Sequence, residues 1–237
     1  MTQVPPVPGV VPGVVRGVVR AVLFDLDGTL IDSAPDLAGT LNDMRHERGL
    51  APWSLQALRA HCGSGARGML GEGLQARPGD VGYEALRQEF LDRYEQRMLA
   101  QTQVFEAVPA LLAALQSRGL PWGIVTNKAM RFVQPMVQAL GLISAGASAL
   151  VAGDSTPHTK PHPAPLLEAA RRVAQPPQAC VYVGDDPRDV TAGRAAGMAT
   201  LVAGWGYTQA APHPVDQWGA HAVLTHPKDL LHWLDLA

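Results

Sequence analysis

The sequence contains only two cysteines among 237 residues, Cys62 and Cys180. Their wide separation fits neither a disulfide framework nor a zinc site. The chain also lacks a basic run, and its formal net charge is -2 at pH 7. This charge gives no electrostatic reason to expect nucleic acid or an anionic membrane as a partner. We therefore expect a cytoplasmic protein.

Charged residues make up only 17% of the chain, and 47% of its residues are hydrophobic. A chain of this length and composition can bury a sizeable core, as one large domain or as one domain with an insert. The first residues differ from the rest, because Pro-Gly-Val-Val occurs twice between Pro8 and Val15. The repeated prolines and glycines prevent this stretch from forming a continuous helix. We expect residues 1–19 to form a disordered, dispensable low-complexity arm.

Long apolar runs are missing, and short ones recur at intervals that predict buried strands. Between these runs lie helical stretches at 129–140, 164–174 and 188–196. This alternation predicts right-handed crossovers and a parallel sheet with helices on both faces, which is a Rossmann-like, doubly wound α/β fold. The predicted strands are Ala21 to Phe24, Trp122 to Val125, Ala149 to Ala152, Cys180 to Val183 and Thr200 to Ala203.

Residues 33–105 show no strand-like alternation. Pro35 marks the start of a helix capped by Asp32 or Ser33, Ser54 caps a short helical segment, and Asp80 opens a longer one. We therefore predict a small, all-helical cap domain at 33–105. It would be inserted into an α/β core domain made of residues 20–32 and 106–237.

Glycine or polar residues directly follow four of the predicted strands. They are Asp25 and Asp27, Thr126 and Asn127, Gly153 and Asp154, and Gly184, Asp185 and Asp186. In an open parallel sheet, ligands bind at the carboxyl ends of the strands. Asp25 and Asp185 offer the hard oxygen ligands that Mg²⁺ prefers. Lys160 lies between prolines that could hold it toward the same edge, and Thr126 can donate to a phosphoryl oxygen.

Four ordered motifs resemble those of the haloacid dehalogenase superfamily of phosphatases, from about residue 20 to the end of the chain. They are Asp-Leu-Asp-Gly-Thr at 25–29, Thr126-Asn127, Lys160-Pro161, and Gly184-Asp185 with Asp189. More narrowly, the chain resembles the phosphoglycolate phosphatase branch, which has a small helical cap. The stretches 63–67, 206–207 and 218–220 look similar to the N-acetylmuramic acid 6-phosphate phosphatases of cell-wall recycling.

The resemblance implies a role for each of the two acids that follow the first strand. Asp25 would attack phosphorus and carry an aspartyl-phosphate. Asp27 would protonate the leaving alcohol and later accept a proton from water. The resemblance also implies that Mg²⁺ is held by Asp25, Asp185 and the backbone carbonyl of Asp27.

The remaining motif residues would bind or support the phosphoryl group. Thr126, Asn127 and Lys160 would contact the phosphate, and Lys160 would also hold the nucleophile. Asp189 would steady Lys160 or a water on the metal. Asp186 is a second acid beside Asp185, and the sequence leaves open whether it shares the task of Asp189.

The segment from Gly63 to Gly68 matches the G-x-G-x-x-G pattern of dinucleotide-binding proteins. It follows a helical segment instead of a strand, so that fingerprint lacks its context. We predict a cap loop over the active site, in which Gly65 permits close approach of a substrate and Arg67 pairs with a substrate carboxylate. A mobile surface loop is the alternative.

Several reactions of the superfamily fit the sequence less well than hydrolysis. The second acid, Asp27, favours phosphoryl transfer over dehalogenation. Residues 33–100 contain no lysine, which disfavours phosphonate cleavage through a Schiff base on the cap. A phosphomutase ranks below hydrolysis, and nothing positive supports a non-catalytic binding protein. We expect 2-phosphoglycolate as substrate, with N-acetylmuramic acid 6-phosphate as the alternative. Monomer and homodimer are both open.

Overall fold

Strand β1 lies in the middle of a parallel sheet in this computed structural model, which describes residues 19–211 and 213–236. The six strands of the sheet are arranged in the order β5-β4-β1-β6-β7-β8, and every neighbouring pair is parallel. They span Ala21–Phe24 (β1), Trp122–Val125 (β4), Ala147–Val151 (β5), Cys180–Gly184 (β6), Ala199–Ala203 (β7) and Ala222–Leu224 (β8). The predicted fold class is confirmed, with β8 as an unpredicted addition at one edge.

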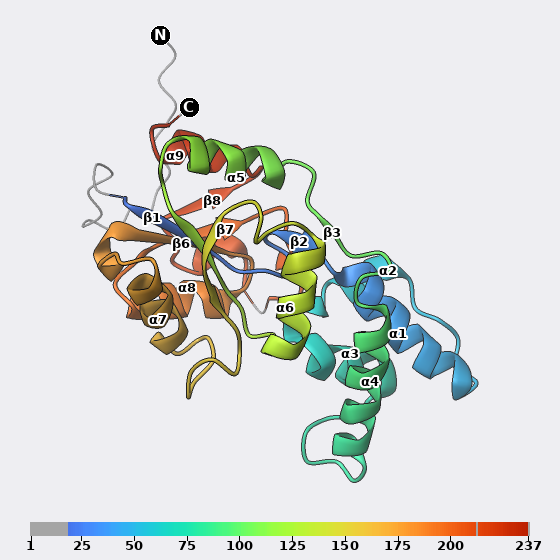
Figure 1. Cartoon of the computed structure of the whole chain (residues 1–237). Coiled ribbons are helices and arrows are strands. Elements are labelled where there is room, and N and C mark those ends of the chain that lie inside the picture. Colours follow the sequence, from blue (N-terminus) through green and yellow to red (C-terminus); the bar gives the residue numbers. More distant parts are fainter. Residues whose placement is uncertain (1–18, 212, 237) are drawn as a thin grey trace, which may run out of the picture.

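Helices cover both faces of the sheet (Figure 1). Figure 1 shows α5 (Val108–Ser117) and α9 (Asp229–Trp233) over one face, with α7 (Ala164–Arg172) and α8 (Pro187–Ala195) on the other. Helix α6 (Met130–Ala139) follows β4. The side chains of β1 alternate between the two layers, because Val22 and Phe24 pack into one core cluster and Ala21 and Leu23 into the other. Strand β1 is therefore buried from both sides.

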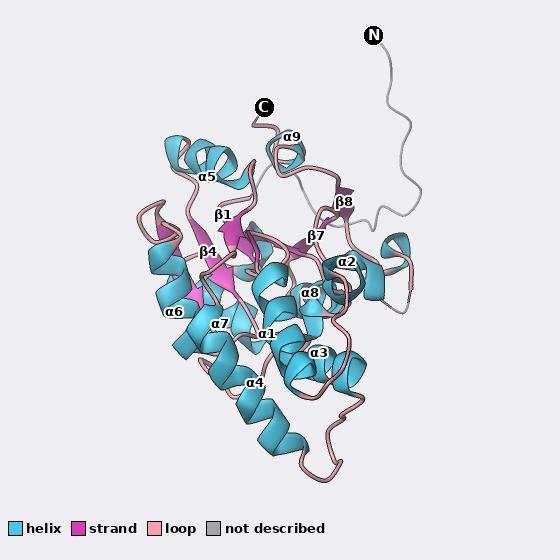
Figure 2. Cartoon of the chain, turned by 90° about the vertical axis from the view of Figure 1, so that its right-hand side faces the viewer, coloured by secondary structure: helices cyan, strands magenta, loops and turns pink. Residues whose placement is uncertain are grey.

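Four further helices lie together beyond one end of the sheet, on the right in Figure 1, and this side of the molecule faces the viewer in Figure 2. They are α1 (Ala34–Glu47), α2 (Leu55–Arg59), α3 (Gly65–Leu74) and α4 (Tyr83–Arg97). The chain enters this group through β2 (Ile31–Asp32) and leaves it through β3 (Gln103–Val104), and these two strands pair antiparallel. We propose that this group is the cap domain, with the predicted boundaries at 33–105, inserted into the core of residues 20–32 and 106–237.

The prediction of no strand between 33 and 105 is wrong at residues 103 and 104. A strand of two residues is too short to show alternation in the sequence, and β3 owes its existence to pairing with β2. The longer cap helix begins at Tyr83 instead of Asp80. The Asp80 side chain accepts a hydrogen bond from the Arg77 N–H at 2.7 Å, so it closes a turn before the helix.

The prediction of a loop from Gly63 to Gly68 is also wrong. Residues Cys62–Ser64 form a 3₁₀ turn, and α3 begins at Gly65. Glycine disfavours a helix interior, which is why the sequence suggested a loop. Met69 and Leu70 are fully buried one turn later, and this packing holds the segment helical despite its glycines.

The described residues contain no helix that is long and apolar enough to cross a membrane. The predicted low-complexity arm at 1–19 falls almost entirely on residues 1–18, which lie outside the described residues. It therefore stays a prediction.

A buried carboxylate joins the two ends of the cap. Asp36, in the first turn of α1, has no exposed surface. It accepts hydrogen bonds from the Thr102 N–H and hydroxyl, both at 2.8 Å, and from the Gln101 N–H at 3.0 Å. These bonds fix the start of α1 against the segment that leads into β3.

We predict that Asp36→Ala destabilises the protein by about 3 kcal/mol, because it leaves the buried N–H and hydroxyl of Thr102 without an acceptor. The matched control is Asp43→Ala on the same helix, whose side chain is 59% exposed and pairs with Arg97. The control should cost less than about 1 kcal/mol, as exposed ion pairs do. Urea unfolding measures both, and equal losses would contradict the role given to Asp36.

Candidate active site

The chain turns sharply where β1 ends. Asp25 and Asp27 follow the strand, and Gly28 adopts φ +81 while its N–H donates to the Ile31 carbonyl at 2.9 Å. A side chain at Gly28 would overlap the carboxylate of Asp185, which comes from the end of β6. Glycine at this position therefore serves both the turn and the close approach of a second acid.

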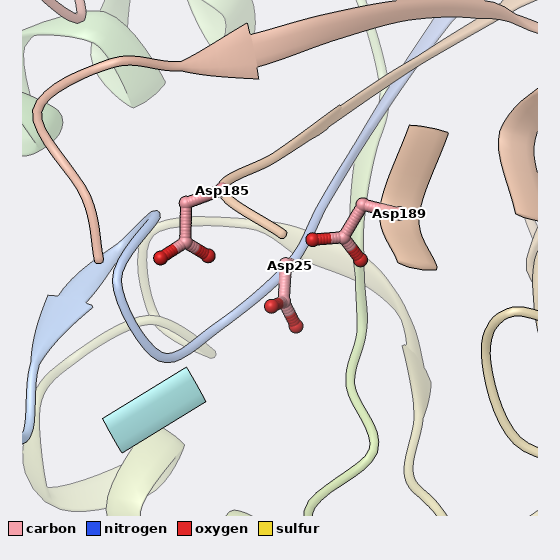
Figure 3. A group of neighbouring side chains, drawn as sticks. All are labelled: Asp25, Asp185 and Asp189. Atoms are coloured by element: carbon pink, nitrogen blue, oxygen red, sulfur yellow. The ribbon is translucent and has the colours of Figure 1, made fainter. Parts of the chain in front are cut away.

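Three carboxylates converge beside this turn. Oxygen atoms of Asp25, Asp185 and Asp189 all lie within 4.8 Å of one another. Figure 3 shows Asp25 between the other two, which come from the end of β6 and from α8. All three residues are buried. The structure thus brings together the predicted nucleophile, a predicted metal ligand and a predicted supporting acid.

Burial makes ionisation of Asp25 and Asp185 unfavourable. Burial raises the pKa of Asp25 to about 7, an effect that Lys160 partly offsets and that Asp189 adds to. Burial, together with the charges of Asp25 and Asp189, raises the pKa of Asp185 well above its usual range. Lys160 is the partner of the buried Oδ1 of Asp25, and no further hydrogen bond reaches that oxygen from the described residues. A group of hard carboxylate oxygen atoms that shares a single ammonium fits a divalent metal ion.

Lys160 supplies a positive charge to this cluster. Its Nζ lies 2.8 Å from Asp25 Oδ1 and 2.7 Å from Asp189 Oδ1. It also donates to the Tyr182 hydroxyl at 2.9 Å and to the Val125 carbonyl at 3.0 Å. Burial opposes the ammonium, but the carboxylates of Asp189 and Asp25 outweigh burial and raise the pKa of Lys160. Lys160 is therefore a fixed cation beside Asp25.

Asn127 holds the segment that carries this lysine. Its side-chain NH₂ donates to the Lys160 carbonyl, and its side-chain oxygen accepts from the Lys160 N–H, both at 2.9 Å. Thr126 is buried at the end of β4 and lines the same cavity as Asp25. The structure thus gives Asn127 a contact with Lys160 that the sequence did not predict.

Asp186 and Asp189, which could not be given separate roles from the sequence, have different partners in the structure. Asp189 meets Lys160, whereas Asp186 caps α8 and pairs with the Arg188 guanidinium at 2.7 Å. Burial alone would raise the pKa of Asp186, but Arg188 outweighs it and lowers that pKa. Arg188 also donates to the Gly63 carbonyl at 2.6 Å, which links α8 to the cap.

Sequence reasoning missed three residues at the site. Lys128 lies 2.7 Å from Asp27 Oδ1, and the Ser33 hydroxyl donates to the same oxygen. Tyr207 donates its backbone N–H to Asp185 Oδ2 at 2.7 Å. The position of Lys128 directly after Thr126-Asn127, in a chain with few lysines, was the available signal. Nothing in the sequence pointed to the contacts of Ser33 and Tyr207.

A cavity of about 510 Å³ opens above these residues, between the core and the cap. Arg67 and Gly65 line it, and they belong to helix α3 instead of the expected loop. Arg87, Arg131 and Phe90 contribute further basic and apolar surface to its wall. The site therefore combines a cluster of charged side chains at its base with a larger, partly apolar cavity above it.

Comparisons with known proteins agree with this geometry. A model of the haloacid dehalogenase-like hydrolase family matches residues 19–197. The N-acetylmuramic acid 6-phosphate phosphatase of Pseudomonas aeruginosa is 39% identical over 216 residues, which cover 91% of this chain and 95% of that protein. A phosphoglycolate phosphatase of Xanthomonas campestris is 44% identical over 209 residues, covering 88% of this chain and 93% of that protein.

A solved structure gives the same result for the fold. The crystal structure of a predicted phosphoglycolate phosphatase from Haemophilus somnus superimposes with a TM-score of 0.78 at 26% identity, and the match covers 93% of this chain and 99% of that one. The family model and these relatives span both the acid cluster and the cap. The chain belongs to the haloacid dehalogenase-like hydrolases.

Proposed function

We propose that this chain is a magnesium-dependent phosphatase that hydrolyses a small phosphomonoester through an aspartyl-phosphate on Asp25. The observation that carries the proposal is the contact of the Lys160 ammonium with Asp25, 2.8 Å away, inside a cluster of three buried acids beside a cavity. Family membership supports the same class of reaction.

Charge repulsion is the main barrier to this reaction. A carboxylate facing a phosphate dianion is repelled by about 4 kcal/mol for each pair of unit charges ~4 Å apart at an effective dielectric near 20. Lys160 opposes this repulsion from the position where it already holds Asp25. Asp25, Asp185 and the backbone carbonyl of Asp27 are the proposed ligands of Mg²⁺. When bound, the ion neutralises phosphoryl charge and polarises a phosphoryl oxygen.

The proposed chemistry has two steps. First, an Asp25 oxygen forms a bond to phosphorus while the bond from phosphorus to the leaving alcohol breaks, and Asp27 gives its proton to the departing oxygen. Second, Asp27 takes a proton from water as the water oxygen attacks phosphorus, which releases inorganic phosphate and restores Asp25. Thr126 donates to a phosphoryl oxygen, and Asn127 acts through its two hydrogen bonds to Lys160.

The substrate we propose first is 2-phosphoglycolate, in which Arg67 would bind the carboxylate. N-acetylmuramic acid 6-phosphate is the second candidate, and the cavity volume of about 510 Å³ favours it. Phosphoglycolate would fill only a small part of that space, whereas an acetylated sugar with a lactyl group also offers apolar surface for Phe90. Relatives named for each substrate have similar identity to this chain.

The proposal includes a cytoplasmic location and either a monomer or a homodimer. Cys62 and Cys180 are both buried and unbridged, which suits a reducing compartment. The partner we propose is the small substrate alone.

We predict that Asp25→Asn lowers kcat at least about 10³-fold, because the amide cannot form the phosphoryl intermediate. Release of inorganic phosphate from p-nitrophenyl phosphate, with Mg²⁺ or with EDTA, measures this. The exposed Asp43→Asn is the matched control and should keep its activity. Activity that survives in Asp25→Asn would contradict the mechanism. With a sugar phosphate in place of p-nitrophenyl phosphate, transfer of the phosphoryl group to another hydroxyl without release of inorganic phosphate would indicate a phosphomutase.

For the substrate, we predict that Arg67→Ala raises KM about tenfold for 2-phosphoglycolate or N-acetylmuramic acid 6-phosphate, because it removes a charged hydrogen bond to their carboxylates. The KM for p-nitrophenyl phosphate, which lacks a carboxylate, should not change. Arg77→Ala is the control, since Arg77 is an exposed cap arginine outside the cavity. Equal effects on all three substrates would remove Arg67 from carboxylate recognition.

Without metal, we predict that the free energy of unfolding of the wild type falls relative to that of Asp25→Asn as pH rises. The folded pKa of Asp25, about 7, exceeds its ordinary value of 3.8, so the folded state binds the extra proton between these values. The wild type should then lose up to about 1.4 kcal/mol per pH unit across this window relative to the variant.

Urea unfolding in EDTA at pH 4 to about 7 measures this difference. Addition of Mg²⁺ should reverse the loss in the wild type, because an ion that binds only the folded state stabilises it. Parallel pH profiles for wild type and Asp25→Asn would show that the Asp25 carboxyl does not carry the predicted shift.

A further inference from the structure

Lys128 joins the proposed acid to the cap. It follows Thr126-Asn127 at the end of β4, and its side chain is only 11% exposed. Its Nζ lies 2.7 Å from Asp27 Oδ1 and 2.8 Å from the Tyr94 hydroxyl on cap helix α4. One ammonium thus contacts a residue of the β1 turn and a residue of the cap, two parts of the chain far apart in sequence.

The two oxygens of Asp27 have different surroundings. Oδ1 accepts from the Lys128 ammonium and from the Ser33 hydroxyl. Oδ2 accepts no hydrogen bond from the residues that the structure describes, and Asp27 lines the cavity. An oxygen that already accepts from an ammonium and a hydroxyl is a poor place for the carboxyl proton. The proton that is exchanged with the substrate must then sit on Oδ2.

We infer that Lys128 is a positioning residue, which fixes Oδ1 of Asp27 so that Oδ2 faces the leaving group, and which depends on cap helix α4 for its own place. The inference rests on the proposed function, because it concerns the acid of that reaction. Lys128 does not exchange the proton itself.

The dependence on the cap comes from Tyr94. Burial raises the pKa of this phenol to about 12, so it meets Lys128 as a neutral hydroxyl. Its ring stacks on Phe90 of the same helix and packs edge-on against Phe132 of α6, which fixes the hydroxyl in space. If α4 moved away, Lys128 would lose its hydrogen bond to Tyr94, and its side chain would fix the position of Asp27 less firmly. Proton transfer would therefore be efficient only with the cap in place.

The competing interpretation is that Lys128 binds the phosphoryl group directly. Substrates with different leaving groups distinguish these two interpretations. An alkoxide needs a proton as it departs, whereas p-nitrophenolate is a stable anion that leaves without one. A residue that positions the acid matters for the first kind of substrate only. A residue that binds the phosphoryl group matters equally for both.

The test is Lys128→Met, assayed on p-nitrophenyl phosphate and on 2-phosphoglycolate, or on N-acetylmuramic acid 6-phosphate if the wild type prefers it. The quantity compared is kcat/KM, because it reports the steps up to departure of the leaving group and excludes the later hydrolysis of the intermediate. We expect about a 10²-fold loss for the alkyl phosphate and only a few-fold loss for p-nitrophenyl phosphate. Lys228→Met, at an exposed lysine, is the control and should change neither.

An equal loss for both substrates would overturn the inference in favour of phosphoryl binding, and no loss for either would overturn it outright. Retained activity on p-nitrophenyl phosphate also shows that the variant is folded. If Lys128→Met does not fold, Tyr94→Phe tests the inference instead, because it removes only the hydroxyl that accepts a hydrogen bond from Lys128.

Tyr94→Phe should lower the ratio of alkyl to aryl kcat/KM in the same direction by a smaller factor. Tyr83→Phe, at a buried tyrosine of the same helix outside the cavity, should leave the ratio unchanged. An unchanged ratio in Tyr94→Phe would refute the dependence on the cap. The proposed function has a separate criterion: hydrolysis that persists in Asp25→Asn refutes it, whatever the ratios are.

Discussion

The ion pairs of Lys160 hold the site together. Its ammonium contacts Asp25 and Asp189 in a place where all three side chains are almost without solvent. Two buried carboxylates this close would repel each other strongly, and a buried charge left without its partner costs about 3–5 kcal/mol. The Val125 carbonyl and the Tyr182 hydroxyl complete the surroundings of the ammonium. The site can keep its acids close because this one cation lies between them.

The strand order explains why these groups meet. Strands β4 and β6 flank β1, so the segments that follow these three strands emerge at one edge of the sheet. In the sequence they are separated by the whole cap and by about half of the core. The crossover rules for parallel sheets bring them together without any direct contact between the motifs along the chain. The cap, inserted after β1, then lies above the same edge.

The sequence predicted most of what depends on local pattern. Strands β1 and β4 were predicted with their observed ends, because each is a short apolar run buried from both sides. Strand β8 escaped prediction since only Leu224 of its three residues is buried. Helix α3 escaped because its glycines suggest a loop, and the burial that overrides them is a tertiary effect.

The acid cluster was predictable because its members follow strands in a known order. The role of Lys128 was not predictable, although this residue stands beside Asn127. It depends on a contact with Tyr94 that no local sequence pattern encodes. Asp186 and Asp189 could not be told apart for a similar reason. Only the packing shows that the first turns to Arg188 and the second to Lys160.

Tyr207 connects the acid cluster to the first residue of the cap through its two ends. Its backbone N–H holds Asp185, while its hydroxyl accepts from the N–H groups of Ser33 and Ala34, at 2.9 and 3.0 Å, and donates to Asp32. The beginning of α1 is thereby bonded to the segment that follows β7. Any displacement of the start of α1 would have to break these hydrogen bonds, so the entry to the cap keeps its place beside Asp185.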